Sequence, residues 1–383
     1  MPHPPGAPLH IAIDASRVTV ARRTGTEHYA LHLIRALLAL ESPHRFTLYF
    51  RDTPAPGLLP EADRAGARVR CRVIPLRRLW THVRFAAALW ADRPDVTFVP
   101  AHTLPVIFPG RAVVTVHDLG YRHFPAAHRR AERLYLDLTT RFSARRARRI
   151  LADSQATRDD LVSLYRIDPG RIVVVYPGVE GIMRADEQAI AAARARYGIP
   201  ARYFLFLGTI QPRKNIRRLA EAFAQYIEMT GDADIALVLA GKPGWLIDPA
   251  RDVLASLPGA VRGRIILTGY VADAEVSGLY SGALALIFPS LYEGFGFPVL
   301  EAMRCETPVL CANTSSLPEL AGEAALLVDP LDVAAIAAGM ARLAREPALR
   351  AELAARGRQQ AAAFTWERAA RAALQALEHA AHA

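Results

Sequence analysis

The chain has 383 residues, of which 52% are hydrophobic and 22% charged, with a formal net charge of +10. This composition excludes a disordered chain, and the length suggests two domains. No run approaches the ~20 apolar residues of a membrane-spanning helix, and the proline-rich start lacks the apolar core of a signal peptide. Three cysteines without paired spacing predict reduced packing residues rather than disulfides or a zinc site.

Short apolar segments alternate with helical segments along nearly the whole chain. Such alternation predicts parallel sheets with helices on both faces. The predicted strands form two series, 9–14, 46–50, 69–74, 96–99, 113–117, 149–152 and 172–176, then 203–207, 235–240, 265–268, 283–288, 308–311 and 325–328. Helices are predicted between them, for example over 27–40 and 215–227. A segment with Pro and Gly at 176–182 separates the series and predicts a linker, hence domains over 1–180 and from 181 onward.

Two predicted loops in the first half of the chain are candidate site segments. One follows the strand at 9–14, and the other follows the buried strand at 113–117. Residues 23–27, Arg-Thr-Gly-Thr-Glu, hold a single glycine, Gly25, which is too few for a glycine-rich phosphate loop. His117 and Asp118 end the strand at 113–117, at the sheet edge where ligands bind. Two interpretations of His117 stay open: a structural residue that Asp118 orients, or a residue of the site.

Positive charge is concentrated in a predicted helix, Arg129–Arg149. Its arginines are Arg129, Arg130, Arg133, Arg141, Arg145, Arg146, Arg148 and Arg149. At about 100° per residue, those at 130, 133, 141, 145 and 148 fall within roughly one third of the circumference. Such a face is either a solvated arginine-rich surface or a docking face for an anionic membrane or a lipid-phosphate acceptor. Aromatic residues are not interleaved as base stacking requires, so nucleic acid is the weakest candidate partner.

The first strand of the second series leads into Gly-Thr-Ile-Gln-Pro-Arg-Lys-Asn, residues 208–215. A diphosphate needs fixed positive charge close to a helix N-terminus, and Arg213 and Lys214 supply it after Gly208. Arginine suits bidentate phosphate contacts, while lysine acts as a point charge. Considered alone, Arg213 and Lys214 would be two exposed cations at the start of a helix. Because they lie in the same domain as the next motif, we interpret them as phosphate-binding residues.

That motif is the most informative stretch of the chain, Glu-Gly-Phe-Gly-Phe-Pro-Val-Leu-Glu over 293–301. We expect Glu293 in the loop after the strand at 283–288, and Glu301 in the first turns of the next helix. The glycines allow close backbone approach to a ligand, and Pro298 suits the first helical turn. The N–H groups of Gly294, Phe295, Gly296 and Phe297 are candidates to hold an anion.

These motifs resemble the retaining nucleotide-sugar glycosyltransferases of family 4, which have the GT-B fold. The resemblance spans nearly the whole chain and is most specific over 203–329. It implies that Glu293 contacts hydroxyls of the donor sugar and that Glu301 binds the ribose of the nucleotide. Thr209 stands where the family usually has an arginine, and Arg213 beside Lys214 resembles the Pro-Arg-Lys-Asn variant found in mannosyltransferases of polysaccharide assembly.

The resemblance also implies an architecture and further site residues. The fold class expected is α/β, with two Rossmann-like domains facing a cleft over 1–180 and 181–363. A terminal helix, 364–383, would cross back to the first domain. His117 would contact the donor sugar or the reacting region, the loop with Gly25 would close over the donor phosphates, and Val271 would lie where backbone groups meet the nucleobase.

We therefore predict a retaining hexosyltransferase of cell-surface polysaccharide biosynthesis, with catalytic residues Glu293 and His117. The favoured donor is GDP-mannose, and the acceptor is a glycan or lipid-linked glycan. Asp232 and Asp234 precede a strand on the wrong side for a metal-binding pair, so no metal or other cofactor is expected. The expected location is the cytoplasm, with peripheral contact at the inner membrane face left open.

Three alternatives remain open at this stage. A GT-B nucleotide-sugar epimerase would use the same cations but no acceptor. A dinucleotide-dependent oxidoreductase is disfavoured, because no G-x-G-x-x-G follows the first strand. A binding protein with a degenerate transferase fold is disfavoured, because both glutamates and both cations are present.

Overall fold

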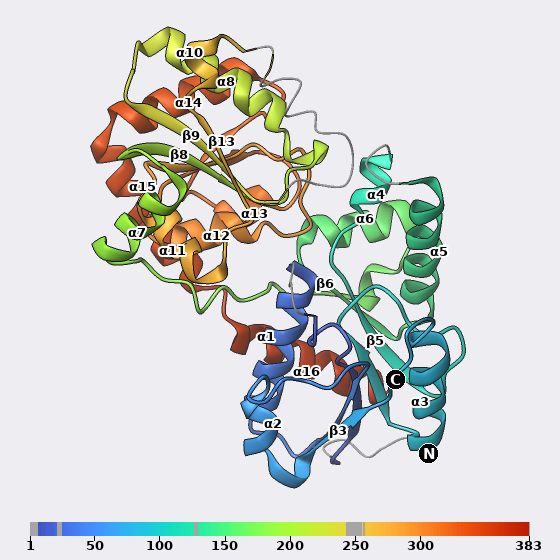
Figure 1. Cartoon of the computed structure of the whole chain (residues 1–383). Coiled ribbons are helices and arrows are strands. Elements are labelled where there is room, and N and C mark those ends of the chain that lie inside the picture. The colour runs from blue at the N-terminus through green and yellow to red at the C-terminus, as the bar shows by residue number, and fades with distance from the viewer. Residues whose placement is uncertain (1–6, 21–24, 126–128, 243–254, 256, 383) are drawn as a thin grey trace. The chain divides into compact units, whose positions relative to one another are not determined.

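The computed structural model describes residues 7–20, 25–125, 129–242, 255 and 257–382. The chain divides into two compact units (Figure 1). Unit 1 comprises Met1–Arg122, Arg130–Gly178 and Phe364–Ala383, and unit 2 comprises His123–Arg129 and Val179–Ala363. Among the described residues, no helix is long and apolar enough to cross a membrane.

Unit 1 is built on a seven-stranded parallel sheet in the order β3-β2-β1-β4-β5-β6-β7. Most of its strands are buried over nearly their full length, because helices cover both faces of a parallel sheet. The strands are β1 His10–Asp14, β2 Arg45–Phe50, β3 Val69–Val73, β4 Val96–Val99, β5 Arg111–Val116, β6 Arg149–Ala152 and β7 Ile172–Val174.

The helices of unit 1 connect these strands and enclose the sheet. They are α1 Gly25–Ala39, α2 Pro60–Arg64, α3 Ala86–Asp92, α5 Arg130–Arg146, α6 Gln155–Tyr165 and α16 Trp366–His382, with α4 Gly120–His123 ending where unit 2 begins. Ser154 is the N-cap of α6, since its Oγ accepts a hydrogen bond from the Thr157 N–H at 3.0 Å.

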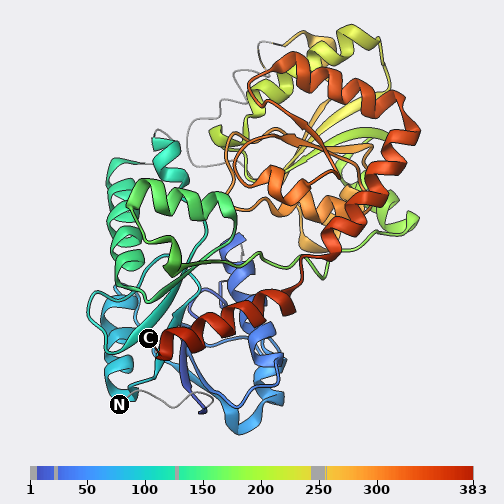
Figure 2. The ribbon, with the colours of Figure 1, turned by 180° about the vertical axis from the view of Figure 1, so that it is seen from behind.

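The last helix, α16, belongs to unit 1 although the chain reaches it from unit 2. It packs on α1, β4, β5 and β6, and Figures 1 and 2 both draw it beside α1. Its buried residues recur every three or four positions, the pattern of an amphipathic helix. They are Trp366, Ala369, Ala370, Ala373, Ala376, Leu377, Ala380 and Ala381.

Unit 2 has a six-stranded parallel sheet in the order β10-β9-β8-β11-β12-β13. The strands are β8 Arg202–Leu207, β9 Ile235–Ala240, β10 Ile265–Gly269, β11 Ala285–Phe288, β12 Val309–Ala312 and β13 Leu326–Val328. The helices are α7 Glu187–Tyr197, α8 Ile216–Thr230, α10 Gly259–Arg262, α11 Asp273–Ser281, α12 Phe297–Arg304, α13 Leu317–Ala321, α14 Val333–Arg345 and α15 Pro347–Ala362.

Each predicted strand is present, with small differences at the ends; the prediction over 172–176, for example, corresponds to Ile172–Val174. Two expectations were wrong. The arginine-rich helix ends at Arg146, because Arg149 already pairs in β6. All three cysteines are free thiols, but Cys71 is exposed and is therefore not a packing residue.

Candidate functional site

Unit 2 brings two loops together at the point where the order of its strands reverses. β8 and β11 are neighbours in the sheet, and the strands continue outward to β10 on one side and to β13 on the other. Open α/β sheets bind ligands at the carboxyl ends of the strands beside such a reversal. The segment after β8 carries Arg213 and Lys214, and the loop between β11 and α12 carries Glu293.

These three side chains form one ion cluster. The Arg213 Nη1 donates to Glu293 Oε2 at 2.8 Å, and the Lys214 Nζ donates to Glu293 Oε1 at 2.5 Å. Arg213 also donates to the Tyr292 carbonyl at 2.9 Å, which fixes the direction of its guanidinium. The structure thus joins residues that lie about 80 positions apart in sequence, at the sheet edge predicted for them.

The cluster is largely shielded from water. The Glu293 carboxylate is buried, and only 7% of Lys214 is exposed. Burial by itself raises the pKa of Glu293, but the charges of Lys214 and then Arg213 outweigh it and lower that pKa to about 2. Glu293 is therefore ionised at neutral pH. A carboxylate with so low a pKa is a poor proton acceptor but a permanent negative charge.

Two serines hold the Glu293 loop in place. The Ser315 Oγ accepts a hydrogen bond from the Glu293 N–H at 2.9 Å. The Ser316 hydroxyl donates to the Glu293 carbonyl at 3.0 Å and also to the Phe295 carbonyl. The sequence analysis assigned neither serine a role. They fix the backbone on both sides of the catalytic candidate.

Asn215 holds the turn that carries Arg213 and Lys214 in place by hydrogen bonds, as the serines do for the Glu293 loop. It has a positive φ of 61°, a conformation that asparagine tolerates better than most residues. Its side-chain amide donates to the carbonyls of Pro289 at 3.0 Å and Pro330 at 2.6 Å. In addition, the Leu291 N–H donates to the Arg213 carbonyl at 2.8 Å. The asparagine of the Pro-Arg-Lys-Asn motif thus ties the turn that carries both cations to the end of β11.

Glycine is required where two loops approach each other beside the cluster. Gly241 has a φ of +144°, and a Cβ built there would lie 2.0 Å from the Gly208 carbonyl oxygen. A Cβ on Gly208 would lie 3.9 Å from the Lys214 Nζ. Any side chain at Gly241 would therefore push the Gly208 backbone away, and Gly208 itself borders the lysine.

Glu301 lies apart from the ion cluster, on α12. The helix starts after Gly296, whose φ of +117° and closeness to Leu317 leave no room for a Cβ. The Tyr280 hydroxyl donates to Glu301 Oε2 at 2.9 Å, and burial raises the pKa of this carboxyl group. Two acidic and two basic side chains were predicted to bind the donor. Three of them, Arg213, Lys214 and Glu293, are in direct contact, and the fourth, Glu301, pairs with Tyr280 instead.

The remaining predicted residues of unit 2 line the same ends of the strands. Gly294 and Phe295 are buried in the loop after β11, and the Phe295 and Phe297 rings lie 4.9 Å apart in an edge contact. Val271 is buried between the end of β10 and the start of α11. Both segments follow carboxyl ends of strands, as predicted.

In unit 1, His117 follows β5 and is buried. Its Nδ1 lies 2.7 Å from Asp153 Oδ2, a partner that follows β6. Asp118, which one of the two interpretations of His117 named as its orienting residue, accepts a hydrogen bond from the Gly120 N–H at 2.8 Å. Gly25 is the exposed first residue of α1. Arg23 and Thr24 of that loop lie outside the described residues.

Aromatic rings enclose the His117–Asp153 pair. The rings of Tyr29 and His102 lie 4.7 Å and 5.3 Å from the His117 ring. Burial, and then the nearby His117, lower the pKa of His102 to about 3. Burial alone would also lower the pKa of His117, but the charge and hydrogen bond of Asp153 outweigh it and raise that pKa. Asp153 therefore favours the imidazolium form of His117.

Asp153→Asn should lower the pKa of His117 and reduce any activity that depends on His117 about tenfold to a hundredfold, since the imidazole loses its charged anchor. Because the folded pKa is raised, the lost stabilisation is largest below the ordinary histidine pKa and vanishes as pH rises through the folded value. Imidazole NMR titration measures the pKa. Asp118→Asn is the matched control and should shift it less; an unchanged His117 titration in Asp153→Asn would exclude Asp153 as a positioning residue.

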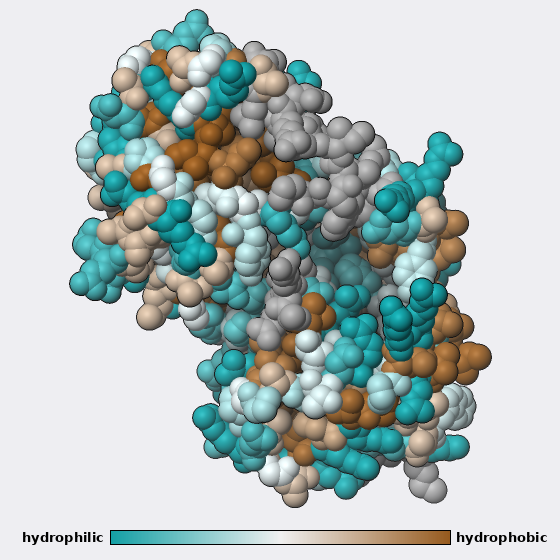
Figure 3. Space-filling view, viewed as in Figure 1, coloured by the Kyte–Doolittle hydropathy of each residue, from teal (hydrophilic) through white to brown (hydrophobic). Residues whose placement is uncertain are grey.

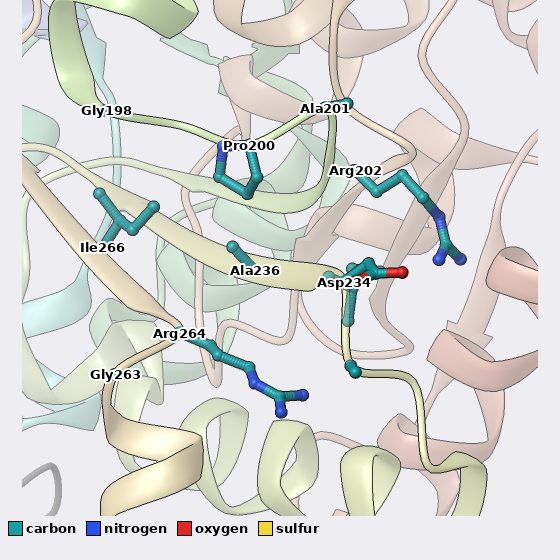
Figure 4. A pocket seen from close by; sticks show the side chains of 11 residues that line it. Gly198, Pro200, Ala201, Arg202, Asp234, Ala236, Gly263, Arg264 and Ile266 are labelled. Carbon is teal, nitrogen blue, oxygen red and sulfur yellow. The ribbon is translucent and has the colours of Figure 1, made fainter.

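A separate pocket of about 520 Å³ lies at the opposite ends of the same strands (Figure 4). Its lining includes the first residues of β8 and β9, Arg202 and Ile235. The basic groups are already engaged: Arg202 pairs with Asp232 at 2.9 Å, and Arg264 donates to the Asp232 carbonyl at 2.8 Å. Asp232 thus has a structural role beside this pocket, away from the ion cluster.

Comparisons with known proteins agree with this geometry. Residues 190–360 match the family described as Glycosyl transferases group 1, and residues 23–180 match Glycosyltransferase Family 4. O-antigen chain mannosyltransferase B of Escherichia coli is 36% identical over 261 residues, which cover 67% of this chain and 67% of that protein. Serotype-specific mannosyltransferase WbdA of Escherichia coli is 32% identical over 234 residues, or 60% of this chain and 28% of that protein.

A solved structure extends the likeness to the fold. Sucrose-phosphate synthase from Thermosynechococcus elongatus superimposes with a TM-score of 0.72 at 22% identity, covering 96% of this chain and 98% of that one. Together with the two parallel sheets, this likeness confirms the predicted GT-B class of two Rossmann-like domains.

Proposed function

The chain belongs to glycosyltransferase family 4, and we propose that this glycosyltransferase moves a mannosyl residue from a nucleotide-diphosphate sugar with retention of anomeric configuration. The acceptor we propose is a glycan or lipid-linked glycan of cell-surface polysaccharide synthesis. The two relatives described above are both mannosyltransferases, and one of them acts on O-antigen chains by name, which supports this choice.

The ion cluster is the observation that carries the proposal. Cleavage of the bond between the sugar and the diphosphate leaves negative charge on the phosphate oxygens. Fixed cations aimed at developing charge lower the barrier, and they do so more strongly where water is excluded. Lys214, buried and held at 2.5 Å from Glu293, and Arg213, tied to the Tyr292 carbonyl, meet both conditions. The N–H groups of Gly294–Phe297 would add to this stabilisation.

Glu293 supplies negative charge rather than a proton acceptor. Because its pKa is about 2, the carboxylate is ionised throughout the reaction and can stabilise the positive character of the anomeric carbon. The bond from that carbon to the phosphate oxygen breaks while the bond to the acceptor oxygen forms on the same face. The acceptor proton then passes to the departing phosphate, which needs no base from the protein. We propose that His117 contacts the donor sugar in this step.

The nucleotide end of the donor would lie farther along the same ends of the strands. We propose that Glu301 binds the ribose and that backbone groups at Val271 meet the base. Glu301 has to exchange its present hydrogen bond from Tyr280, or share it, to do so. A metal-free reaction, with Arg213 and Lys214 in place of a divalent cation, remains part of the proposal.

Thermal unfolding with GDP-, UDP-, dTDP- and ADP-sugars tests the donor. A donor at 100 times its dissociation constant should stabilise the native state by about 2.7 kcal/mol, so we expect GDP-mannose to raise the Tm most. Transfer to an isolated glycan acceptor, with NMR of the new anomeric centre, then tests retention. Inversion of configuration, or no Tm shift with any of the four donors, would contradict the proposal.

The epimerase alternative predicts chemistry without an acceptor. Protein and donor alone should then yield an epimerised nucleotide sugar, whereas a transferase should give at most slow hydrolysis. The same incubation analysed by chromatography separates the two enzymes.

A further inference from the structure

α5 of unit 1 presents a stripe of exposed leucines flanked by arginines. Measured from Arg130 at about 100° per residue, Leu134, Leu138, Arg141 and Arg145 lie at roughly 40°, 80°, 20° and 60°, so the five residues share an arc of about 80°. All five are exposed. We call this set the α5 stripe.

The apolar members of this surface are unusually open to water. Leu134 is 58% exposed, Leu138 57% and the neighbouring Tyr135 54%. The opposite face of the helix is the one that packs into unit 1, through the buried residues Thr140, Ser143 and Ala144. Because α5 is anchored through its other face, the exposure of Leu134 and Leu138 does not result from a helix that is detached from unit 1. Two large side chains facing water on one stripe indicate a contact surface.

The loop between β4 and β5 packs against the other side of α5 and adds an exposed apolar residue there. It is fixed to α5 by a hydrogen bond from the Leu104 N–H to the Ser143 Oγ at 2.9 Å. The Arg146 guanidinium lies 4.5 Å from the centre of the Phe108 ring, and Ile107 between these contacts is exposed. Figure 3 shows brown and teal atoms intermixed along the right-hand edge of unit 1, on the side where Figure 1 draws α5.

The charges of the α5 stripe are available to a partner. Within the described part of the chain, no carboxylate pairs with Arg130, Arg141 or Arg145. The acidic residue nearest to the stripe on α5, Asp137, instead pairs with Arg122 at 3.4 Å and accepts from the Tyr165 hydroxyl at 2.8 Å. The surface therefore combines positive charge with apolar side chains.

We propose that the α5 stripe is a docking surface for an anionic lipid bilayer. Arginines attract acidic headgroups, and the leucines between them can enter the boundary of the acyl chains, the combination found on interfacial helices. The long arginine side chains can keep their charges at headgroup level while the helix lies flat. This inference depends on the surface alone and does not require the donor or the reaction proposed above.

Other occupants fit less well. A second copy related by twofold symmetry would bring the same arginines face to face, and like charges across an interface cost affinity. A nucleic acid would use the arginines but gain little from two leucines, and one tyrosine is not a stacking platform. Both remain measurable outcomes of the test.

Sedimentation of the full chain with vesicles tests the proposal. We expect binding to vesicles in which about a third of the lipid is phosphatidylglycerol, little binding to pure phosphatidylcholine, and weakening by salt. R141E/R145E changes the charge by four units and should lower the partition coefficient about 600-fold, because each unit of charge near such a surface contributes about fivefold. R262E/R345E, with the same change in charge on exposed arginines of unit 2, is the matched control and should stay within about threefold.

A variant of the two leucines is the second part of the sedimentation experiment. L134S/L138S keeps every charge and should lower the partition coefficient about tenfold, with the loss persisting at high salt. Circular dichroism checks that each variant is folded. The proposal is overturned if the wild-type chain does not bind the anionic vesicles, if R141E/R145E and its control behave alike, or if L134S/L138S changes nothing. Tight DNA binding lost in R141E/R145E, or dimerisation lost in L134S/L138S without lipid, would assign the surface to those partners.

Discussion

Glu293→Gln should lower kcat about a thousandfold, because the substitution keeps the shape of the side chain and removes the charge. In the native protein this charge faces the anomeric carbon in the proposed reaction and also holds Lys214 at 2.5 Å and Arg213 at 2.8 Å. The amide can still accept one hydrogen bond, but it cannot offset two cations. Initial rates with saturating donor and acceptor measure the loss.

The same substitution should destabilise unit 2. Removing one partner of a buried ion pair leaves the other uncompensated, at a cost of about 3–5 kcal/mol, and Lys214 is almost fully buried. Glu293→Ala should be worse, since it also opens a cavity. Glu323→Gln, at an exposed carboxylate of the same unit, is the control for both rate and stability. Near-normal turnover in a folded Glu293→Gln protein would remove Glu293 from the chemistry.

The pH dependence of stability gives an independent check on Glu293. Its folded pKa of about 2 lies below the ordinary glutamate value, so its contribution is fully present above the unfolded pKa and is lost as pH falls toward 2. The wild-type Tm should therefore drop more steeply than that of Glu293→Gln as calorimetry is carried from about pH 5 toward pH 3. Parallel curves would mean that the carboxylate is not held by the cations in solution.

The strands were predictable because buried parallel strands are continuous apolar runs bounded by turn residues. Ile235–Ala240 and Val96–Val99, for instance, are buried along their whole length and were predicted with these ends. The position of Glu293 followed from the same logic, since a polar residue in the loop that follows such a run lies at the ligand-binding edge of the sheet. The strands, and the residues in the loops that follow them, could therefore be predicted from the sequence.

Hydrogen-bond partners that lie far apart in the sequence could not be predicted. Asp153 lies 36 residues from His117, and only the pairing of β5 with β6 brings the ends of these strands together. The sequence offered only the adjacent Asp118, in one of the two interpretations of His117. Ser315 and Ser316 reach the Glu293 loop from the segment after β12 in the same way. The sequence therefore indicated candidate reacting groups but not the residues that hold them.

Lys214→Met should reduce kcat/KM by about a thousandfold and weaken binding of the free nucleoside diphosphate, because methionine fills the same buried space without the charge. Arg213→Lys keeps a charge but loses the planar fork that Tyr292 and Glu293 orient, so we expect a smaller loss of about tenfold. Calorimetric titration with the nucleoside diphosphate, beside initial rates, separates binding from turnover. Unchanged affinity and rate in Lys214→Met would show that Lys214 serves only as a counter-ion.

The double variant distinguishes the two roles of Lys214. If its ammonium both balances Glu293 and binds the leaving diphosphate, Lys214→Met combined with Glu293→Gln should recover much of the stability lost in Glu293→Gln, since neither charge is then buried alone. The transfer rate should not recover, because both proposed contributions to the transition state are absent. Arg213 would remain paired with the Tyr292 carbonyl in that protein, so the folded loop would persist without its chemistry. Stability and rate that recover together would instead mean that the ion cluster acts through folding alone.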